Sequence, residues 1–310
     1  MADSAKFSDI QNGPNFNSFP EESSDAESTV VPRFSINQMT TLRASFEEDL
    51  SARQLAGVAA IGLWRKKIEE VGESFAVEAV RKSGLDVTTL SYAGGFSGSA
   101  GLQFREALED GYDALFTAAA VGARTLIVSP GSRARYTARH EFRLVTQAIR
   151  ELSFVAEELD VQLAVMPRTS RHAGRWTSLH SFENAIALCD ATGRNNVGVV
   201  FDTFYLAEDG DALKLAEQCV DRIFVLQLND ALDSNGLEYA QCLPGAGNLQ
   251  VRETIQCLYG SGFSGDVDVQ IFAEEMWKQD VNDVLAACQC QVSSMLRNCL
   301  AEASASVGVS

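Results

Sequence analysis

Short apolar and β-branched runs alternate with longer stretches of helical periodicity from Arg33 onward. Such alternation is typical of repeated βα units that build a parallel sheet. Eight runs fit strands, and we predict them at residues 34–37, 59–64, 87–91, 125–129, 162–166, 197–202, 223–228 and 267–272. The clearest helices are predicted at residues 45–56, 73–83, 102–121 and 138–159.

The number of these units indicates whether the sheet is closed into a barrel or open. Eight strand–helix units of this length favour a closed (β/α)₈ TIM barrel over residues 33–300, although a doubly wound open sheet shows the same alternation. No G-x-G-x-x-G motif follows the first predicted strand, which weakens a dinucleotide-binding open sheet. Gly84, Gly122 and Gly193 stand where helices are expected to end, as left-handed caps require.

Both ends of the chain differ from the predicted barrel. Residues 1–32 carry six acidic residues against one basic residue, Lys6, among Ser, Asn, Gly and Pro. Such a segment cannot bury enough apolar surface to offset the entropy lost on ordering, so we predict a disordered acidic tail. Residues 301–310 are expected to form a flexible C-terminus.

Charge and composition narrow the class of partner. The 310 residues carry a formal net charge of -17, which repels phosphate backbones and anionic lipid headgroups. No apolar run approaches the roughly 18–20 residues that a membrane span needs. We therefore expect a cytoplasmic protein that binds neither nucleic acid nor membranes.

The cysteines indicate reduced thiols rather than a metal site. All seven lie in the second half of the chain, their number is odd and no C-x-x-C pair occurs. They are Cys189, Cys219, Cys242, Cys257, Cys288, Cys290 and Cys299. Cys288 and Cys290 are two residues apart on a predicted helix and should point to different faces.

Candidate functional residues are those at the strand ends, because TIM barrels build their sites at the C-terminal face. Only two of the predicted ends carry a carboxylate, Asp202 and Asp230, and none carries a histidine. Arg168 and Arg175 flank His172 after the fifth strand, where they either hold an anionic substrate or lie in a solvated loop.

Several segments in one order and spacing point to a known family. They are residues 34–41, 57–64 and 84–91 with Gly94-Gly95-Phe96, then residues 163–167 and 199–205, the turn at 243–247, and residues 262–272. Together these resemble the xylose-isomerase-like TIM barrels, which include sugar-phosphate isomerases and epimerases, ketose epimerases and inositol-pathway dehydratases. The resemblance covers about residues 34–296.

The resemblance also implies a metal site, and this chain departs from it. Active members hold a divalent cation with a glutamate, an aspartate, a histidine and a glutamate that end the fifth to eighth strands. The matching positions are Met166, Asp202, Gln227 and Gln270, so three of the four ligands are replaced. Three further positions differ from the family pattern. Tyr205 stands where the family usually has a histidine, Gln241 about where it has an arginine, and Ala246 where it has an acidic residue.

These replacements remove charge and proton-transfer groups together. A hard divalent cation requires oxygen ligands with negative charge. The four residues here carry a total charge of -1, whereas the four ligands of the family pattern carry -3. The two family glutamates also transfer protons, which contributes roughly 10²–10⁴-fold each, and neither Met166 nor Gln270 can do so. We expect no metal and no cofactor.

Alternative structural roles exist for the same residues. Asp202 fits a strand-end carboxylate satisfied by backbone N–H groups as well as it fits a ligand contact. Met166 fits a core residue, and Glu274 and Glu275 fit a solvated helix start. Gln227 and Gln270 keep hydrogen-bonding capacity, which suggests that a polar pocket persists.

The predicted function is a pseudoenzyme-like binder of a sugar or small polyol. Its predicted ligand-binding residues are Met166, Arg168, Asp202, Gln227, Asp230 and Gln270. The alternative is an active isomerase or epimerase that holds Mn or Mg through displaced ligands such as Asp202, Asp230, His172 or Glu274. An abasic-site endonuclease would need several metal ligands and a basic DNA-binding face, and the sequence shows neither. A homo-oligomer is compatible with the sequence.

Overall fold

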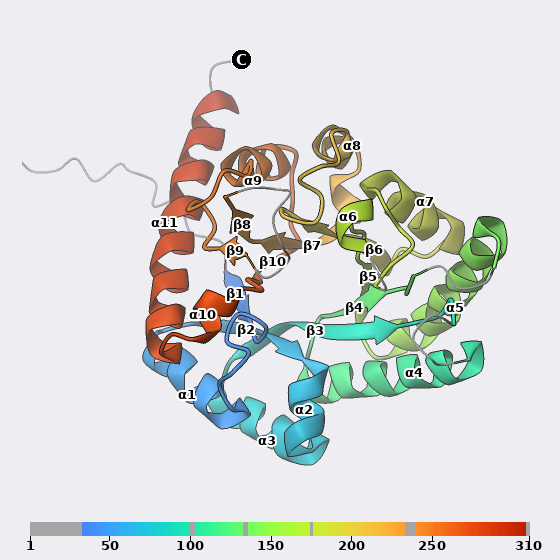
Figure 1. The fold of residues 1–310 in the computed structure, drawn as a ribbon, viewed down its shortest axis with the longest axis horizontal. Helices are drawn as coiled ribbons and strands as arrows, with labels where there is room; N and C mark the ends of the chain where they lie inside the picture. The colour runs from blue at the N-terminus through green and yellow to red at the C-terminus, as the bar shows by residue number, and fades with distance from the viewer. Residues whose placement is uncertain (1–32, 99–102, 133–135, 174–175, 233–239, 308–310) are drawn as a thin grey trace, which may run out of the picture.

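A computed structural model describes residues 33–98, 103–132, 136–173, 176–232 and 240–307. Its strands close into a parallel barrel in the order β1-β10-β7-β6-β5-β4-β3-β2, with helices around the outside (Figure 1). The predicted TIM barrel is therefore confirmed and the open sheet is excluded. The predicted acidic tail at residues 1–32 lies outside the described residues.

The barrel strands match the eight predicted runs to within two or three residues at each end. They are β1 (Phe34–Asn37), β2 (Ala60–Trp64), β3 (Asp86–Gly94), β4 (Thr125–Ser129), β5 (Gln162–Val165), β6 (Val197–Asp202), β7 (Ile223–Leu228) and β10 (Asp266–Val269). A separate two-stranded antiparallel sheet joins β8 (Asp230–Ala231) to β9 (Gln241–Cys242).

The helices fill the connections between strands. They are α1 (Phe46–Leu55), α2 (Arg65–Val71), α3 (Glu73–Ser83), α4 (Phe104–Val121), α5 (Ala138–Glu158), α6 (Ser170–Ala173), α7 (Phe182–Thr192), α8 (Ala212–Gln218), the 3₁₀ turn η1 (Val220–Arg222), α9 (Val251–Gly260), α10 (Glu274–Trp277) and α11 (Val281–Val307). The chain boundary expected at residue 301 falls inside α11, which continues to Val307.

Local chemistry explains where the predicted helices begin and end. Ser45 accepts from the Glu48 backbone N–H while the Glu48 side chain accepts from the Ser45 N–H, which forms a capping box for α1. Gly84, Gly122 and Gly193 end α3, α4 and α7 with φ of 69°, 76° and 65°, as predicted.

Inside the barrel, one half is apolar and the other is polar. Strands β4 to β7 contribute Ile127, Ala164, Val200 and Val225 to one buried cluster. Strands β10, β1 and β3 contribute hydrogen-bonding side chains, which centre on the buried carboxylate of Asp268. The barrel interior below the C-terminal strand ends is therefore not uniformly hydrophobic.

Strand β3 carries two irregularities that enlarge this polar half. Its register with β2 shifts at Thr88, and its register with β4 shifts at Tyr92. An extra residue in a strand re-aims the side chains beside it. Thr88 donates to the Ser35 hydroxyl at 2.6 Å, and the Tyr92 hydroxyl lies 3.3 Å from Gln270 Oε1.

The cysteines lie as their spacing in the sequence predicts. None of the seven cysteines forms a disulfide, and Cys288 is buried while Cys290 is exposed, as their spacing predicts. No helix within the described ranges combines the length and the apolar character that a membrane crossing requires.

Candidate functional site

The predicted strand-end residues lie at the C-terminal face in two hydrogen-bonded groups. Gln227 Nε2 donates to Gln270 Oε1 at 3.0 Å, which joins the ends of β7 and β10. Asn229 Nδ2 lies 3.1 Å from Asp202 Oδ2 and 3.2 Å from the backbone oxygen of Gln270, and it links the second group to the first. The sequence analysis did not select Asn229 as a site residue.

Asp202 is fully buried at the end of β6, and its oxygens already have partners. Oδ1 accepts from the backbone N–H groups of Phe204 at 2.9 Å and Tyr205 at 2.8 Å. Burial raises the pKa of Asp202 to about 6, although those N–H groups, Arg168 and Asn229 act in the opposite direction. The predicted alternative of a strand-end carboxylate satisfied by backbone N–H groups therefore matches what is observed.

Arg168 is buried rather than solvated, with 2% of its surface exposed. Its guanidinium stacks over the Tyr205 ring at 3.9 Å and the Trp176 ring at 5.1 Å, and its Nη2 lies 3.9 Å from the Met166 sulfur. The solvated-loop interpretation is wrong for Arg168, whereas Arg175 lies outside the described residues. A permanent positive charge thus lies beside Met166 and acts on the Asp202 carboxylate.

A second buried carboxylate, Asp268, was missed by the sequence analysis. Its oxygens accept from the Ser35 hydroxyl at 2.7 Å, Asn37 Nδ2 at 2.9 Å and, at 3.3 Å, from Thr89 and Gln227. Burial raises its pKa. The sequence does hold a signal for it, because Asp268 and Gln270 are two residues apart on one strand and so share a face.

Tyr92 completes this network from the other side of the barrel. Its hydroxyl donates toward Gln270 Oε1, and its ring lies 6.3 Å from that of Trp176. Burial raises the pKa of Tyr92, so its hydroxyl stays protonated and acts as a hydrogen-bond donor. The Oε1 atom of Gln227, by contrast, has no hydrogen-bond partner in the described part of the chain.

Asp230 lies at the same face but serves the loop after β9. Its two oxygens accept from the backbone N–H groups of Ala231, Gly245, Gly247 and Leu249 at 2.8–3.0 Å. A carboxylate engaged by four amides has little capacity left for another ligand. The structure thus brings Asp230 near the predicted site but assigns its oxygens to the loop.

The other displaced ligands considered in the sequence analysis do not converge. His172 is buried against the rings of Phe204 at 4.6 Å and Tyr205 at 5.8 Å. Glu274 begins α10 on the surface and pairs with Lys278, which confirms the solvated helix start. Across the described ranges, no three His, Cys, Asp or Glu side chains are grouped so that they could hold a metal ion.

The residues present do not fit a divalent cation. Asp202 is occupied by backbone N–H groups, and Gln270 Oε1 accepts from both Gln227 and Tyr92. Met166 supplies a thioether, which hard cations of the Mg or Mn type do not select. The guanidinium of Arg168 beside these atoms would repel a second positive charge.

Comparison with known proteins finds inosose isomerases that are similar to this chain at low identity. An inosose isomerase from Bacillus velezensis is 24% identical over 188 residues, which cover 59% of this chain and 65% of that protein. The inosose isomerase from Bacillus subtilis is 25% identical over 142 residues, which cover 44% of this chain and 49% of that protein. The chain thus matches about half to two thirds of the length of these relatives.

Solved structures extend the similarity in fold. A protein from Sinorhizobium meliloti superposes with a TM-score of 0.77 at 24% identity, covering 87% of this chain and 98% of that one. An L-ribulose 3-epimerase superposes with a TM-score of 0.72 at 15% identity, covering 90% and 98%. The model of the xylose isomerase-like TIM barrel family matches residues 56–288. This chain therefore belongs to the xylose isomerase-like TIM barrel family.

Proposed function

We propose that this protein binds a sugar or small polyol at the C-terminal face of its barrel without a divalent metal, and that it has no metal-dependent isomerase activity. The observation that carries the proposal is the buried guanidinium of Arg168. It lies beside Met166 and acts on Asp202, two of the four positions that match the family's metal ligands. A fixed organic cation in that place makes a metal ion unnecessary for balancing the remaining carboxylate.

The polar groups that remain suit hydroxyl-rich ligands. Gln227 Oε1 is buried and lacks a hydrogen-bond partner in the described structure, so it can accept a hydrogen bond from a ligand hydroxyl. Trp176, which is 36% exposed and whose ring lies 6.3 Å from that of Tyr92, offers an aromatic surface that suits the C–H face of a sugar ring. The inosose isomerase relatives support polyols and their ketones as the first compounds to test.

Access of such a ligand to the site requires side-chain movement. Met166, Arg168, Asp202, Gln227 and Gln270 are each at most 2% exposed, whereas Trp176 is 36% exposed. Trp176 is therefore the accessible member of the Arg168 stack. We propose that rotation of Trp176 and Arg168 opens the polar group to the ligand.

An active, metal-free isomerase is the second candidate, and one observation favours it. Burial raises the pKa of Asp202 to about 6, close to the range in which a carboxyl can exchange protons near neutral pH. Its Oδ1 accepts from two backbone N–H groups and its Oδ2 from Asn229, which makes proton transfer to a substrate difficult. The two candidates differ in whether a ligand is turned over.

The test is isothermal titration calorimetry with myo-inositol, an inosose and D-ribulose, each in EDTA and in millimolar Mn²⁺. We expect at least one of the three to bind with the same Kd in both buffers. Gln227→Met should weaken that binding roughly tenfold, because the acceptor for a ligand hydroxyl is lost. Gln279→Met, which alters an exposed glutamine that contacts Glu275, is the matched control.

Product analysis of the same mixtures separates the candidates. Ketose interconversion in EDTA that disappears in Asp202→Asn would establish the active isomerase. Binding or turnover that requires Mn²⁺, or the absence of binding by all three compounds, would contradict the proposed metal-free binder.

A further inference from the structure

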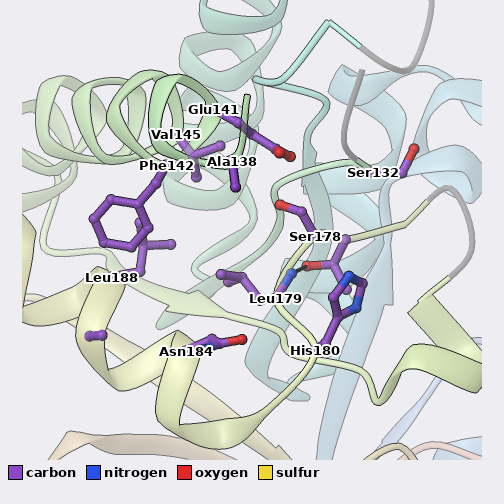
Figure 2. Close-up of a pocket in the computed structure, with 12 residues that line it drawn as sticks. Ser132, Ala138, Glu141, Phe142, Val145, Ser178, Leu179, His180, Asn184 and Leu188 are labelled. Carbon is purple, nitrogen blue, oxygen red and sulfur yellow. Dashed lines mark hydrogen bonds between the residues drawn. The ribbon is translucent and has the colours of Figure 1, made fainter. Parts of the chain in front are cut away.

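A cavity of about 680 Å³ lies between α5 and α7, beside the segment that carries Thr177 and Leu179. Its walls come from the first turns of α5, from α7 and from the segment that leads into α7 (Figure 2). None of the six predicted ligand-binding side chains lines it. The cavity is therefore distinct from the proposed sugar site, although Leu179 in its wall accepts a hydrogen bond from the backbone N–H of Arg168.

Glu141 of α5 is the unusual residue of this cavity. The residue is only 3% exposed, and its Oε1 atom has no hydrogen-bond partner within the part of the chain that the structure describes. Figure 2 shows its carboxylate extending from α5 toward the segment that carries Ser178. A buried carboxylate oxygen without a partner is costly, and an added group that donates a hydrogen bond would relieve that cost.

Two features favour a positively charged ligand at this carboxylate. Glu141 lies in the first turn of α5, where the helix dipole favours negative charge. The protein as a whole carries a formal net charge of -17, which raises the local concentration of small cations. Both effects favour a positively charged donor over a neutral one.

The rest of the lining combines an apolar wall with polar groups. Phe142 and Val145 of α5, Leu188 of α7 and Leu179 of the connecting segment present hydrocarbon to the cavity. His180 and Asn184 add polar groups (Figure 2). A compact apolar body would be buried here, whereas a sugar would leave its hydroxyls against the hydrocarbon wall.

We propose that this cavity binds a small amphipathic cation, namely a primary ammonium attached to a compact apolar group. The ammonium donates to the Glu141 carboxylate and forms a buried ion pair with it. The apolar group packs between Phe142, Leu179 and Leu188. Ligand charge and ligand hydrophobicity are both necessary, so an anion and a purely polar amine are excluded.

The experiment uses benzylammonium as the probe, with benzyl alcohol and benzoate as neutral and anionic isosteres. Calorimetric titration of the full chain should detect benzylammonium binding and no comparable binding of either isostere. Glu141→Gln should weaken the binding roughly tenfold or more, because the buried charge pair is lost. Thermal melting should show that Glu141→Gln is at least as stable as the parent, since an uncompensated buried charge has been removed.

Two further variants make the result specific. Glu158→Gln removes the same charge from an exposed position on the same helix and should leave the affinity unchanged. Ala187→Phe adds a ring at an exposed position that lines the cavity and should abolish binding without unfolding the barrel. Equal binding of benzyl alcohol, binding that survives Ala187→Phe, or an equal loss in Glu158→Gln would overturn the proposal.

Discussion

Asp202 and Asp268 are two buried carboxylates that the barrel stabilises by different means. Asp202 accepts from the backbone N–H groups of the turn after β6, whereas Asp268 accepts from neutral side chains on β1, β3 and β7. Burial raises the pKa of both. In each case the folded state therefore holds a proton more tightly than the unfolded chain does.

The stability of the protein should depend on pH through Asp202. A pKa raised on folding adds stability at low pH, and this stability is lost as pH rises from about 4 through about 6. The loss corresponds to roughly 3 kcal/mol at most. Asp202→Asn removes this titration, so its melting temperature should improve relative to the parent between pH 4 and pH 7. A difference in melting temperature between the two proteins that stays constant from pH 4 to pH 7 would contradict a raised pKa of Asp202.

Gly62 on β2 is required by the Asp268 network. A methyl group at this position would lie 2.5 Å from Asn37 Nδ2 and 2.6 Å from Asp268 Oδ1. Gly62→Ala should therefore destabilise the fold by about 1–3 kcal/mol, measured by denaturant unfolding. Gly210→Ala, where nothing lies within 4 Å of the added carbon, serves as the control and should change stability little.

At the scale of elements, Asp230 links the short strand β8 to the loop that follows β9. Its carboxylate accepts from four backbone N–H groups, three of which belong to Gly245, Gly247 and Leu249. Gly247 must lack a side chain, because a carbon there would lie 2.3 Å from Asp230 Oδ1. The Leu-Pro-Gly turn, which carried part of the family resemblance, is thus held in place by a residue predicted to bind ligand.

Asp230→Ala should release this loop. Four amides lose their acceptor, so we expect a stability loss of about 2–4 kcal/mol and faster hydrogen exchange at Gly245, Gly247 and Leu249. Asn248→Ala removes a single exposed contact to the Leu232 oxygen and should have a small effect. Unchanged exchange in Asp230→Ala would mean that the loop is held by other contacts.

Sequence periodicity predicted the strands and helices well because each has its own local signal. Buried parallel strands appear as short apolar runs, and helix ends are marked by residues such as Ser45 and Gly122. The burial of Arg168 carries no such signal, because it depends on the rings of Tyr205 and Trp176 from other segments. The reach of Tyr92 to Gln270 likewise depends on an irregularity in β3 that the pattern does not reveal.

At the scale of the whole molecule, the barrel keeps the family architecture, and its C-terminal face places Arg168 beside a position that the resemblance matched to a metal ligand. The strand order and the positions of Met166, Asp202, Gln227 and Gln270 follow the closed barrel. The guanidinium of Arg168 lies 3.9 Å from the sulfur of Met166. A carboxylate introduced at position 166 would therefore form an ion pair with this guanidinium, which competes with coordination of a metal ion.

Restoring a metal site should consequently require two changes at once, namely new ligands and removal of Arg168. The variant Met166→Glu, Gln227→His, Gln270→Glu should melt at nearly the same temperature with and without millimolar Mn²⁺, because Arg168 pairs with the new carboxylate. Adding Arg168→Ala should lower stability without metal, since like charges then cluster around Asp202. Mn²⁺ should stabilise this quadruple variant by about 4 kcal/mol when its concentration is roughly 1,000 times Kd. The parent should show little shift. A large metal-dependent shift in the parent would mean that another set of residues binds the ion, and no shift in the quadruple variant would mean that the four strand ends no longer surround one point.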